Sequence, residues 1–175
     1  MKICIIGTGY VGLVSGTCFA DLGNEVICVD KDKNKIFKLN SGISPIYEPG
    51  LDELIKKNYS AKRLSFTTDI KSAVNSSDII FICVGTPTKK RSINVDLSFV
   101  YKCTKEILKY TKKKKILVTK STVPIGTGDQ IEKILRIKKK LFTVISNPEF
   151  LREGEAIRDF RYPDRIAVGS NDKKI

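Results

Sequence analysis

Three glycines within six residues, directly after an apolar run, constrain the fold of this chain more than any other feature. The apolar run covers residues 3–6, and the glycines follow as G-T-G-Y-V-G over residues 7–12. An uncharged run of this kind is typical of a strand buried on both faces of a parallel sheet. Apolar residues then recur at helical spacing as far as Leu22, and a second apolar run ends at Asp30. The pattern predicts a strand, a tight turn, a helix and a second strand.

Each glycine of the turn has its own physical role in such a unit. Gly7 permits the tight turn, Gly9 leaves the backbone open to a diphosphate, and Gly12 lets the helix pack closely on the strand. The free N–H groups at the start of the helix attract phosphate oxygens. Asp30 follows the second strand, where a carboxylate accepts hydrogen bonds from a ribose diol and repels a 2′-phosphate. We therefore predict a site for NAD rather than NADP, a preference that the lysines at 31, 33 and 35 weaken.

Two other interpretations of these features stay open. Glycines also mark ordinary turns in other α/β domains. The net charge is +13, with basic runs at residues 89–91, 112–115 and 138–140, so a nucleic-acid-binding protein has to be weighed. A solvated, lysine-rich surface is the favoured interpretation, because neither interleaved aromatic residues nor a recognition-helix pattern accompanies the charge. We expect no nucleic-acid partner.

Length and composition favour one soluble globular domain. The chain has 175 residues, of which 41% are hydrophobic and 29% are charged. That length allows one sizeable core, and the composition differs from that of disordered chains. No apolar run approaches the roughly 20 residues of a membrane helix, and the glycine turn begins too early to leave room for a signal peptide. We expect a cytoplasmic protein with no membrane partner.

Cysteine and histidine usage narrows the chemistry further. The five cysteines are odd in number, and no pair has metal-ligand spacing. They are Cys4, Cys18, Cys28, Cys83 and Cys103. We expect reduced, buried and unreactive thiols, and no metal site. The chain contains no histidine, which excludes a histidine-dependent catalytic triad and a histidine-ligated zinc site within it.

Strands and helices alternate along the rest of the chain. The pattern predicts helices near residues 31–40, 51–59, 70–74, 97–108, 128–137 and 155–160, and strands at 64–67, 78–84, 115–119, 141–145 and 165–168. Asp69 and Asp96 are expected to cap the helices that follow them. Such alternation predicts an α/β fold of the Rossmann type, with a doubly wound, mainly parallel sheet and helices on both faces. Ligands of these sheets lie beyond the carboxyl ends of the strands.

That rule brings five loops to one rim of the sheet. They are the turn at residues 7–12, Asp30, and the loops at residues 84–88, 121–127 and 147–154. Val84, Gly85 and Thr86 are placed where the ribose and nicotinamide half of a dinucleotide would run, although a plain turn explains them as well. The hydroxyls that begin the 121–127 loop either face a ligand or bond the backbone in a turn.

The loop at residues 147–154 reads N-P-E-F-L-R-E-G and has two interpretations. Pro148 suits a first helical turn capped by Asn147, which would put Glu149 and Glu153 on one helix face. Like charges at that spacing raise one pKa, as a general base requires. Spacing alone favours the alternative, in which these glutamates cap the helix and pair with the arginines at 152, 158 and 161.

Five motifs together resemble one known family. They are G-T-G-Y-V-G at 7–12, P-I-Y-E-P-G at 45–50, V-G-T-P at 84–87, S-T-V-P-I-G-T at 121–127 and N-P-E-F-L-R-E-G at 147–154. Their order resembles the amino-terminal domain of the UDP-glucose 6-dehydrogenases, which are NAD-dependent nucleotide-sugar dehydrogenases, over essentially the whole chain. The resemblance implies an oxidoreductase that converts the C6 alcohol of UDP-glucose to a carboxylate with two NAD. The product, UDP-glucuronate, serves polysaccharide biosynthesis.

The resemblance also implies roles for individual residues. NAD would be held by Gly7, Gly9, Tyr10, Val11, Gly12, Asp30, Lys35, Val84, Gly85, Thr86, Ser121, Thr122 and Glu153. Thr122 would hold a catalytic water, and Glu149 would act with that water as general acid and base. The sugar nucleotide would be bound by Glu149, Phe150, Leu151, Arg152 and Glu153.

The chain departs from the family at one point. Family members are homo-oligomers that continue into a long central helix and a UDP-binding domain, which carries the nucleophilic cysteine together with a lysine and an asparagine. None of the five cysteines here lies in a matching motif. The resemblance implies that residues 1–175 are the NAD-binding domain alone, with an incomplete UDP-glucose site. We expect NAD binding without turnover, and exposed apolar surface where the second domain would pack. Alternatives are a UDP-N-acetylmannosamine or GDP-mannose dehydrogenase fragment and a non-catalytic NAD-sensing module.

Overall fold

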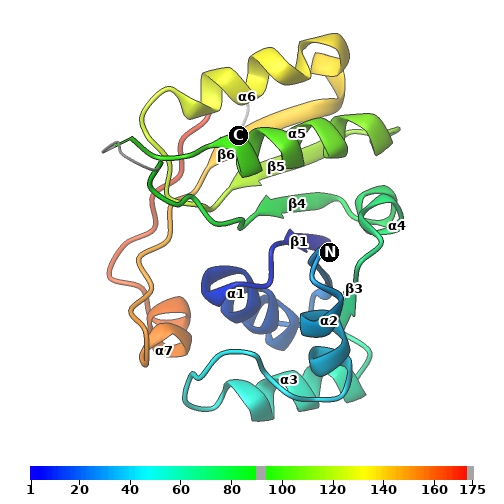
Figure 1. Ribbon diagram of the computed structural model, residues 1–175, viewed down its shortest axis with the longest axis vertical. Coiled ribbons are helices and arrows are strands. Elements are labelled where there is room, and N and C mark those ends of the chain that lie inside the picture. Colours follow the sequence, from blue (N-terminus) through cyan, green and yellow to red (C-terminus); the bar gives the residue numbers. More distant parts are fainter. Residues whose placement is uncertain (90–93, 173–175) are drawn as a thin grey trace.

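A six-stranded parallel sheet forms the centre of the computed structural model, which describes residues 1–89 and 94–172 (Figure 1). Its strands are β1 (Lys2–Ile6), β2 (Glu25–Val29), β3 (Leu64–Thr67), β4 (Ile79–Ile82), β5 (Lys115–Thr119) and β6 (Phe142–Ser146). Their order across the sheet is β3-β2-β1-β4-β5-β6, and each neighbouring pair is parallel. The order reverses between β1 and β4, and in such sheets a ligand crevice opens there, beyond the carboxyl ends of the strands.

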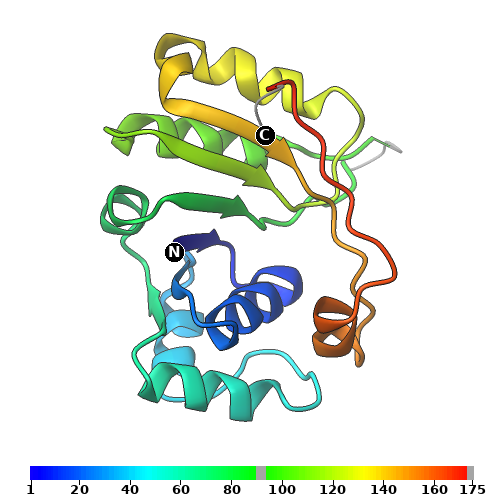
Figure 2. The same ribbon diagram turned by 180° about the vertical axis from the view of Figure 1, so that it is seen from behind.

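Helices cover both faces of this sheet (Figures 1 and 2). They are α1 (Tyr10–Asp21), α2 (Lys33–Asn40), α3 (Leu51–Ser60), α4 (Ile70–Ser76), α5 (Ser98–Tyr110), α6 (Thr127–Leu135) and α7 (Ala156–Arg161), with a 3-10 helix η1 (Arg136–Leu141) after α6. Buried side chains of α1, α2, α3 and α7 share one hydrophobic cluster with the sheet, and those of α4, α5 and α6 share the other. The predicted doubly wound fold of the Rossmann type is therefore confirmed.

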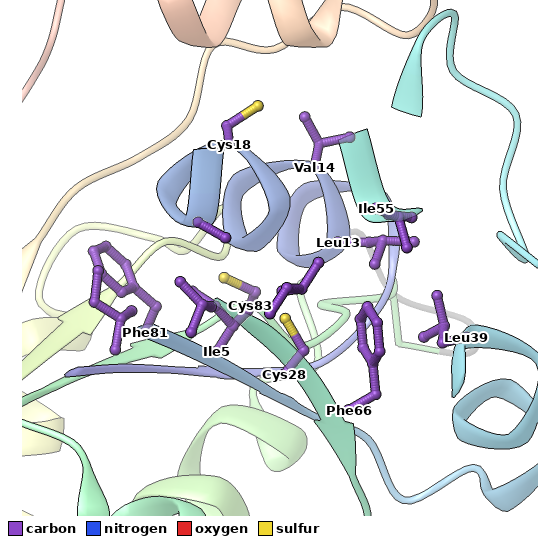
Figure 3. Close-up of a cluster of buried hydrophobic side chains, with 14 of the residues drawn as sticks. Ile5, Leu13, Val14, Cys18, Cys28, Leu39, Ile55, Phe66, Phe81 and Cys83 are labelled. Atoms are coloured by element: carbon purple, nitrogen blue, oxygen red, sulfur yellow. The ribbon is translucent and has the colours of Figure 1, made fainter. Parts of the chain in front are cut away.

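The first of these clusters contains three of the five cysteines (Figure 3). Cys28 and Cys83 lie between the sheet and α1, and Cys18 projects from α1 itself. All five cysteines are buried and free, which confirms the prediction of reduced, buried thiols. Burial raises the pKa of both Cys18 and Cys83 to about 12, so neither thiol forms a thiolate readily at neutral pH.

The predicted strand at residues 165–168 does not form, and this prediction was wrong. Just after it, Gly169 exchanges two 2.8 Å backbone hydrogen bonds with Ser146 in an isolated antiparallel bridge, and the Ser170 hydroxyl donates to Val144 O at 2.9 Å. The segment I-A-V suggested a buried strand, yet Ile166 and Val168 are 72% and 60% exposed. The segment runs past the end of the edge strand β6 as a strap and forms no ladder with it.

Helix ends agree with the sequence in part. Asp69 caps α4 as predicted, accepting a 3.1 Å bond from Ser72 N. Asp96 lies one residue before the N-cap position of α5, although its carboxylate still accepts a 2.9 Å bond from Ser98 N. The chain continues as η1 where a longer α6 was predicted.

Two lysines of the basic runs have structural roles at the edge opposite the rim. Lys115 Nζ donates to the carbonyls of Asn75, at 3.2 Å, and Ser77, near the end of α4. Lys138 Nζ donates to Leu108 O and Thr111 O at 3.0 and 2.9 Å, at the end of α5. Both ammonium groups therefore satisfy helix C-terminal carbonyls.

Two further predictions concern the surface and the membrane. Residues 90 and 91 of the first basic run lie outside the described residues. Within residues 1–89 and 94–172, no helix has the length and apolar character needed to cross a membrane.

Candidate functional site

The glycine turn between β1 and α1 is packed on one side and open on the other. Gly7 has φ +104°, and a Cβ added there would lie 2.5 Å from Cys83 O. A Cβ on Gly12 would lie 1.9 Å from Gly7 O. A Cβ on Gly9 would meet no atom within 4 Å. Two of the glycines are thus required by close packing, whereas the third leaves free space above the backbone, as a bound diphosphate requires.

Helix α1 begins with unused donors beside this free space. Its N-cap residue, Gly9, provides no side-chain cap, and its first turn contains no acidic residue. The first intrahelical bond is the 2.9 Å bond from Leu13 N to Gly9 O. The N–H groups of the first turn and the positive end of the helix dipole are therefore available to an anionic ligand.

Asp30 lies against the glycine turn, as the sequence predicted. Its Oδ2 accepts bonds from Thr8 N at 2.9 Å and Thr8 Oγ1 at 2.8 Å, and its Oδ1 accepts one from Asp32 N at 3.0 Å. Partial burial raises the pKa of Asp30, but these hydrogen bonds and the nearby Lys35 charge outweigh it, so the net pKa is lowered. A carboxylate has about four acceptor positions, so capacity for a ribose hydroxyl remains. Sequence reasoning missed Thr8, although its place between two glycines was the available signal.

The rim loops after β4 and β5 are bonded to each other. Ser121 is buried, and its hydroxyl donates to Val84 O at 2.7 Å. Thr86 Oγ1 donates to Thr122 O at 3.0 Å. The Ser121 hydroxyl therefore bonds backbone, the alternative left open for these hydroxyls, and it fixes the two loops beside each other. Gly85 lies in the first of these loops, between Val84 and Thr86, and is exposed at the rim.

Thr122 and Glu149 are brought together from two different loops. Glu149 Oε1 lies 3.5 Å from Thr122 Oγ1, and Glu149 Oε2 accepts a 3.1 Å bond from Leu151 N. Lys120 is buried close by and donates to Asn147 Oδ1 at 3.3 Å. Burial lowers the pKa of Lys120, against the opposing effects of Cys83 and Glu149. The sequence analysis missed Lys120, which no motif distinguished from the many surface lysines.

The predicted helical turn at the start of the 147–154 loop is absent, and this prediction was wrong. The loop is irregular until α7 begins at Ala156. Asn147 caps no helix, because its Nδ2 donates to Ala167 O at 2.9 Å and ties the loop to the strap. Glu149 and Glu153 therefore do not share a helix face, and the like-charge argument for a raised pKa loses its geometric basis.

The alternative pairing of these two glutamates with arginines is also wrong. Arg152 Nη2 lies 2.6 Å from Asp159 Oδ1. The other two arginines pair with Glu155 and Asp21. Hydrogen bonds from Arg152 lower the pKa of Asp159 to about 2. The acidic partners of these arginines lie outside residues 147–154, so the spacing within that motif gave no indication of them.

A hollow of about 950 Å³ lies under the strap, beside the rim. The predicted substrate residues Glu149, Phe150, Leu151 and Arg152 all line it. Glu153 does not line it and is exposed. A second hollow of similar volume lies among lysines near the amino-terminal ends of β5 and β6, away from the rim loops.

The remaining predicted residues lie at the start of α1. Tyr10 is half-buried, and its hydroxyl bonds Glu48 and Gly154 rather than facing the free space above Gly9. Val11 is half-buried and packs against the first hydrophobic cluster. Across the described residues, no group of three or more His, Cys, Asp or Glu side chains is placed to hold a metal ion.

Comparison with known proteins gives consistent matches over the whole chain. Residues 1–175 match the family model described as the UDP-glucose/GDP-mannose dehydrogenase family, NAD binding domain. A UDP-glucose 6-dehydrogenase of Rhizobium meliloti is 55% identical over 171 residues, which cover 97% of this chain and 39% of that protein. The chain thus spans about two fifths of the length of this relative.

Two solved structures show the same fold. The ternary complex of GDP-mannose dehydrogenase from Pseudomonas aeruginosa superposes with a TM-score of 0.94 at 40% identity, over 99% of this chain and 42% of that one. The UDP-glucose dehydrogenase of Pyrobaculum islandicum has a TM-score of 0.92 at 37% identity, over 98% and 41%. Both cover nearly all of the present chain.

Proposed function

Because this chain belongs to the UDP-glucose/GDP-mannose dehydrogenase family as its NAD-binding domain, we propose that it forms the cofactor half of a UDP-glucose 6-dehydrogenase. The glycine turn carries this proposal. Free space above Gly9, packed glycines on either side and an uncapped helix form a cradle for a diphosphate. The residues present therefore fit the cofactor that the family uses.

Each rim residue has a place in this proposal. The N–H groups of the first turn of α1 would hold the diphosphate, and Asp30 would accept from the adenosine ribose while Lys35 lies close to it. Val84, Gly85 and Thr86 would line the nicotinamide half, next to Ser121 and Thr122. Bound NAD would accept a hydride from the sugar carbon. The protein contributes position, exclusion of water and proton transfer.

Thr122 and Glu149 would carry the proton transfer. Their oxygens lie 3.5 Å apart, close enough to bind one water together. Glu149 would then take a proton through that water as the alcohol is oxidised, and Lys120 provides a buried positive charge beside it. Phe150, Leu151 and Arg152 line the adjoining hollow, where the sugar nucleotide would lie.

Turnover needs groups that the described chain does not supply. A covalent intermediate requires an accessible thiolate, and all five cysteines are buried with raised pKa values. We propose that the chain binds NAD without oxidising UDP-glucose, and that the rest of a longer protein would complete the UDP-glucose site. The test follows NADH absorbance after UDP-glucose and NAD are added to the purified chain. A flat trace is expected, and steady turnover would contradict the proposal.

Exposed apolar side chains beside the hollow support a covering partner segment. Leu22, Phe150, Ile166 and Val168 line the hollow and are 70%, 44%, 72% and 60% exposed. Apolar groups gathered in this way mark interfaces, and the Rhizobium meliloti relative is more than twice as long. We propose that the remainder of a family protein packs there and that such a protein is a homo-oligomer. We also propose that it lies in the cytoplasm, because free buried thiols are typical of that compartment.

Cofactor choice provides a direct test of the role of Asp30. A lowered pKa keeps this carboxylate charged at neutral pH, so a 2′-phosphate beside it is repelled. Calorimetric titration should give tighter binding of NAD than of NADP. Asp30→Asn should weaken NAD binding roughly tenfold or more, since charge-assisted hydrogen bonds contribute about 1.5–3 kcal/mol, and should reduce the preference. Glu106→Gln, which removes a negative charge at an exposed residue of α5, serves as the control. Equal preference in wild type and Asp30→Asn would refute the role.

The identity of the sugar nucleotide is a further part of the proposal. UDP-glucose is favoured by the identity of 55% to the Rhizobium meliloti enzyme. The high TM-score to a GDP-mannose dehydrogenase keeps that substrate as the second candidate. A longer protein containing this chain should oxidise UDP-glucose faster than GDP-mannose, and the opposite order would decide for the second candidate.

A further inference from the structure

The motif P-I-Y-E-P-G at residues 45–50 has no role in the site described so far. Its central residue, Glu48, is 6% exposed, although charged side chains are seldom buried without partners. Oε2 of Glu48 accepts a short hydrogen bond from the Tyr10 hydroxyl and a 2.8 Å bond from Gly154 N. Its Oε1 accepts a 3.3 Å bond from Ile157 N. One carboxylate thus satisfies donors from three segments.

The motif holds Glu48 firmly in this place. Pro45 and Pro49 restrict the backbone of the loop. The carbonyl of Glu48 accepts a 3.1 Å bond from Leu51 N, which fixes the loop to the first turn of α3. Gly50, with φ +78°, makes the turn that lets α3 begin there. The carboxylate is therefore presented by a stiff loop rather than by a mobile one.

The three bonded segments belong to the two halves of the proposed site. Tyr10 is the first residue of α1, directly after Gly9. Gly154 ends the loop that carries Glu149, and Ile157 lies in the first turn of α7. Gly154 N also lies 2.9 Å from the Tyr10 hydroxyl. Glu48 therefore connects the start of the cofactor helix with the end of the loop that lines the substrate hollow.

The other end of α7 is attached independently of Glu48. Arg161 Nη2 lies 2.8 Å from Asp21 Oδ2, at the end of α1. The ring of Phe160 packs edge-on against Phe19 at 5.0 Å. Removal of the Glu48 carboxylate should consequently loosen the 150–157 segment, which keeps the direct contact between Gly154 N and the Tyr10 hydroxyl, without detaching α7 or unfolding the domain.

We propose that Glu48 is a positioning residue that clamps the 147–154 loop to the start of α1, so that cofactor binding and the order of the substrate loop are coupled. This inference rests on the proposed function. A ligand at the first turn of α1 restrains Tyr10 and, through Glu48, the amide of Gly154 at the end of the loop that carries Phe150. Two sites that share one bonded element influence each other reciprocally.

Glu48→Gln tests the clamp with little change in shape. Glutamine has one acceptor oxygen and one NH₂ group in place of two acceptor oxygens. It cannot accept from Gly154 and Ile157 at the same positions, so at least one of these amides loses its bond to residue 48. Glu155→Gln is the matched control, because it makes the same chemical change at an exposed residue beside the same loop.

Hydrogen exchange resolved along the sequence gives the decisive measurement. In wild type, saturating NAD should slow exchange both at residues 7–12 and at residues 150–157. In Glu48→Gln, NAD at saturation should still protect residues 7–12, while the protection of 150–157 is lost. Weaker NAD binding, by roughly threefold or more, should accompany the loss. Glu155→Gln should behave as wild type. A purely structural role of Glu48 would alter the baseline exchange but leave the NAD-dependent change in place.

The Tyr10 phenol gives a second readout that needs no cofactor. Burial and the bond to Glu48 raise the pKa of Tyr10 to about 12. Absorbance titration of the tyrosines should show the Tyr10 component moving toward the ordinary value near 10 in Glu48→Gln. Tyr10→Phe, which keeps the Glu48–Gly154 bond, should preserve part of the NAD-dependent protection at 150–157.

The possible failures are distinguishable. If wild type binds no NAD, the proposed function fails, and with it the coupling. If wild type binds NAD and Glu48→Gln keeps full NAD-dependent protection at 150–157, the positioning role is overturned while the proposed function stands. An unchanged Tyr10 titration in a folded Glu48→Gln variant would also overturn it.

Discussion

Gly12→Ala should destabilise the domain because helix α1 and the preceding turn touch through bare backbone. The added Cβ would lie 1.9 Å from Gly7 O and 3.0 Å from Cys83 Cβ. Neither the carbonyl nor the strand end can move aside as a flexible side chain would. Overpacking in a close-packed core costs about 1–3 kcal/mol, and backbone contact favours the upper end. Alanine regains up to about 1 kcal/mol of helix propensity, so we expect a net loss of about 1–2 kcal/mol.

Gly16→Ala provides the matched comparison within the same helix. Its propensity gain is the same, but the new Cβ would meet the sulfur of Cys28 at 2.7 Å and Ile5 Cγ1 at 3.2 Å. Side chains can shift where a carbonyl cannot, so the loss should be smaller than for Gly12→Ala. Gly85→Ala, with no atom within 4 Å, should leave stability unchanged within about 0.5 kcal/mol.

Urea unfolding followed by circular dichroism measures all three variants. With slopes of about 1–3 kcal/mol per molar urea, a loss of about 2 kcal/mol moves the midpoint by roughly 1 M. The urea midpoint should be highest for Gly85→Ala, lower for Gly16→Ala and lowest for Gly12→Ala. A Gly12→Ala midpoint equal to that of Gly85→Ala would refute the close-packing account of the turn.

Three further predictions concern the core, the basic edge and acid stability. A thiol reagent added to the folded protein should label none of the five cysteines, and all five once urea unfolds it, by mass spectrometry. Lys115→Met should lower the thermal midpoint by several degrees, because it leaves the carbonyls of Asn75 and Ser77 without their donor; Lys114→Met is the exposed control. Asp30 and Asp159 have lowered pKa values. Their stabilising contribution is present above the ordinary aspartate pKa and should disappear as the pH falls toward 2, in unfolding curves measured from pH 5 to pH 2.

The fold was predictable because local and global signals agree along most of the chain. The apolar runs at β1, β2, β4 and β5 are buried on both faces, and only a parallel sheet with helical crossovers accommodates several of them. The glycines at 7 and 12 indicated by their spacing alone that two backbones lie in contact. The sequence therefore placed Asp30 correctly, beyond the end of β2 and against the glycine turn.

What escaped the sequence depends on partners far away along the chain. Ile166 and Val168 read as a buried strand, yet burial requires a neighbour that the described chain does not place beside them. The 147–154 loop read as a helix start, but Asn147 bonds Ala167 instead of capping. The spacing of residues within the loop cannot reveal such bonds, because they are formed between segments that only the folded sheet brings together.

Lys120 and Glu48 illustrate the same limit at the site itself. Among many lysines, nothing in the sequence marked Lys120 as buried beside Glu149. Glu48 lay in a motif without an assigned role, and its function as a clamp depends on residues 38 and 106 positions away. Burial of a charged group is a tertiary property, so only the folded arrangement of the segments reveals it.

The most direct test of the central claim is calorimetric titration of NAD into wild type and into Gly9→Val, with thermal unfolding of both as the control for folding. No atom lies within 4 Å of a Cβ at Gly9, so the valine should leave the fold intact but occupy the space proposed for the diphosphate. The account predicts clear binding by wild type, and in Gly9→Val an affinity at least tenfold weaker with a similar unfolding temperature. Equal NAD affinity in the two proteins would contradict it.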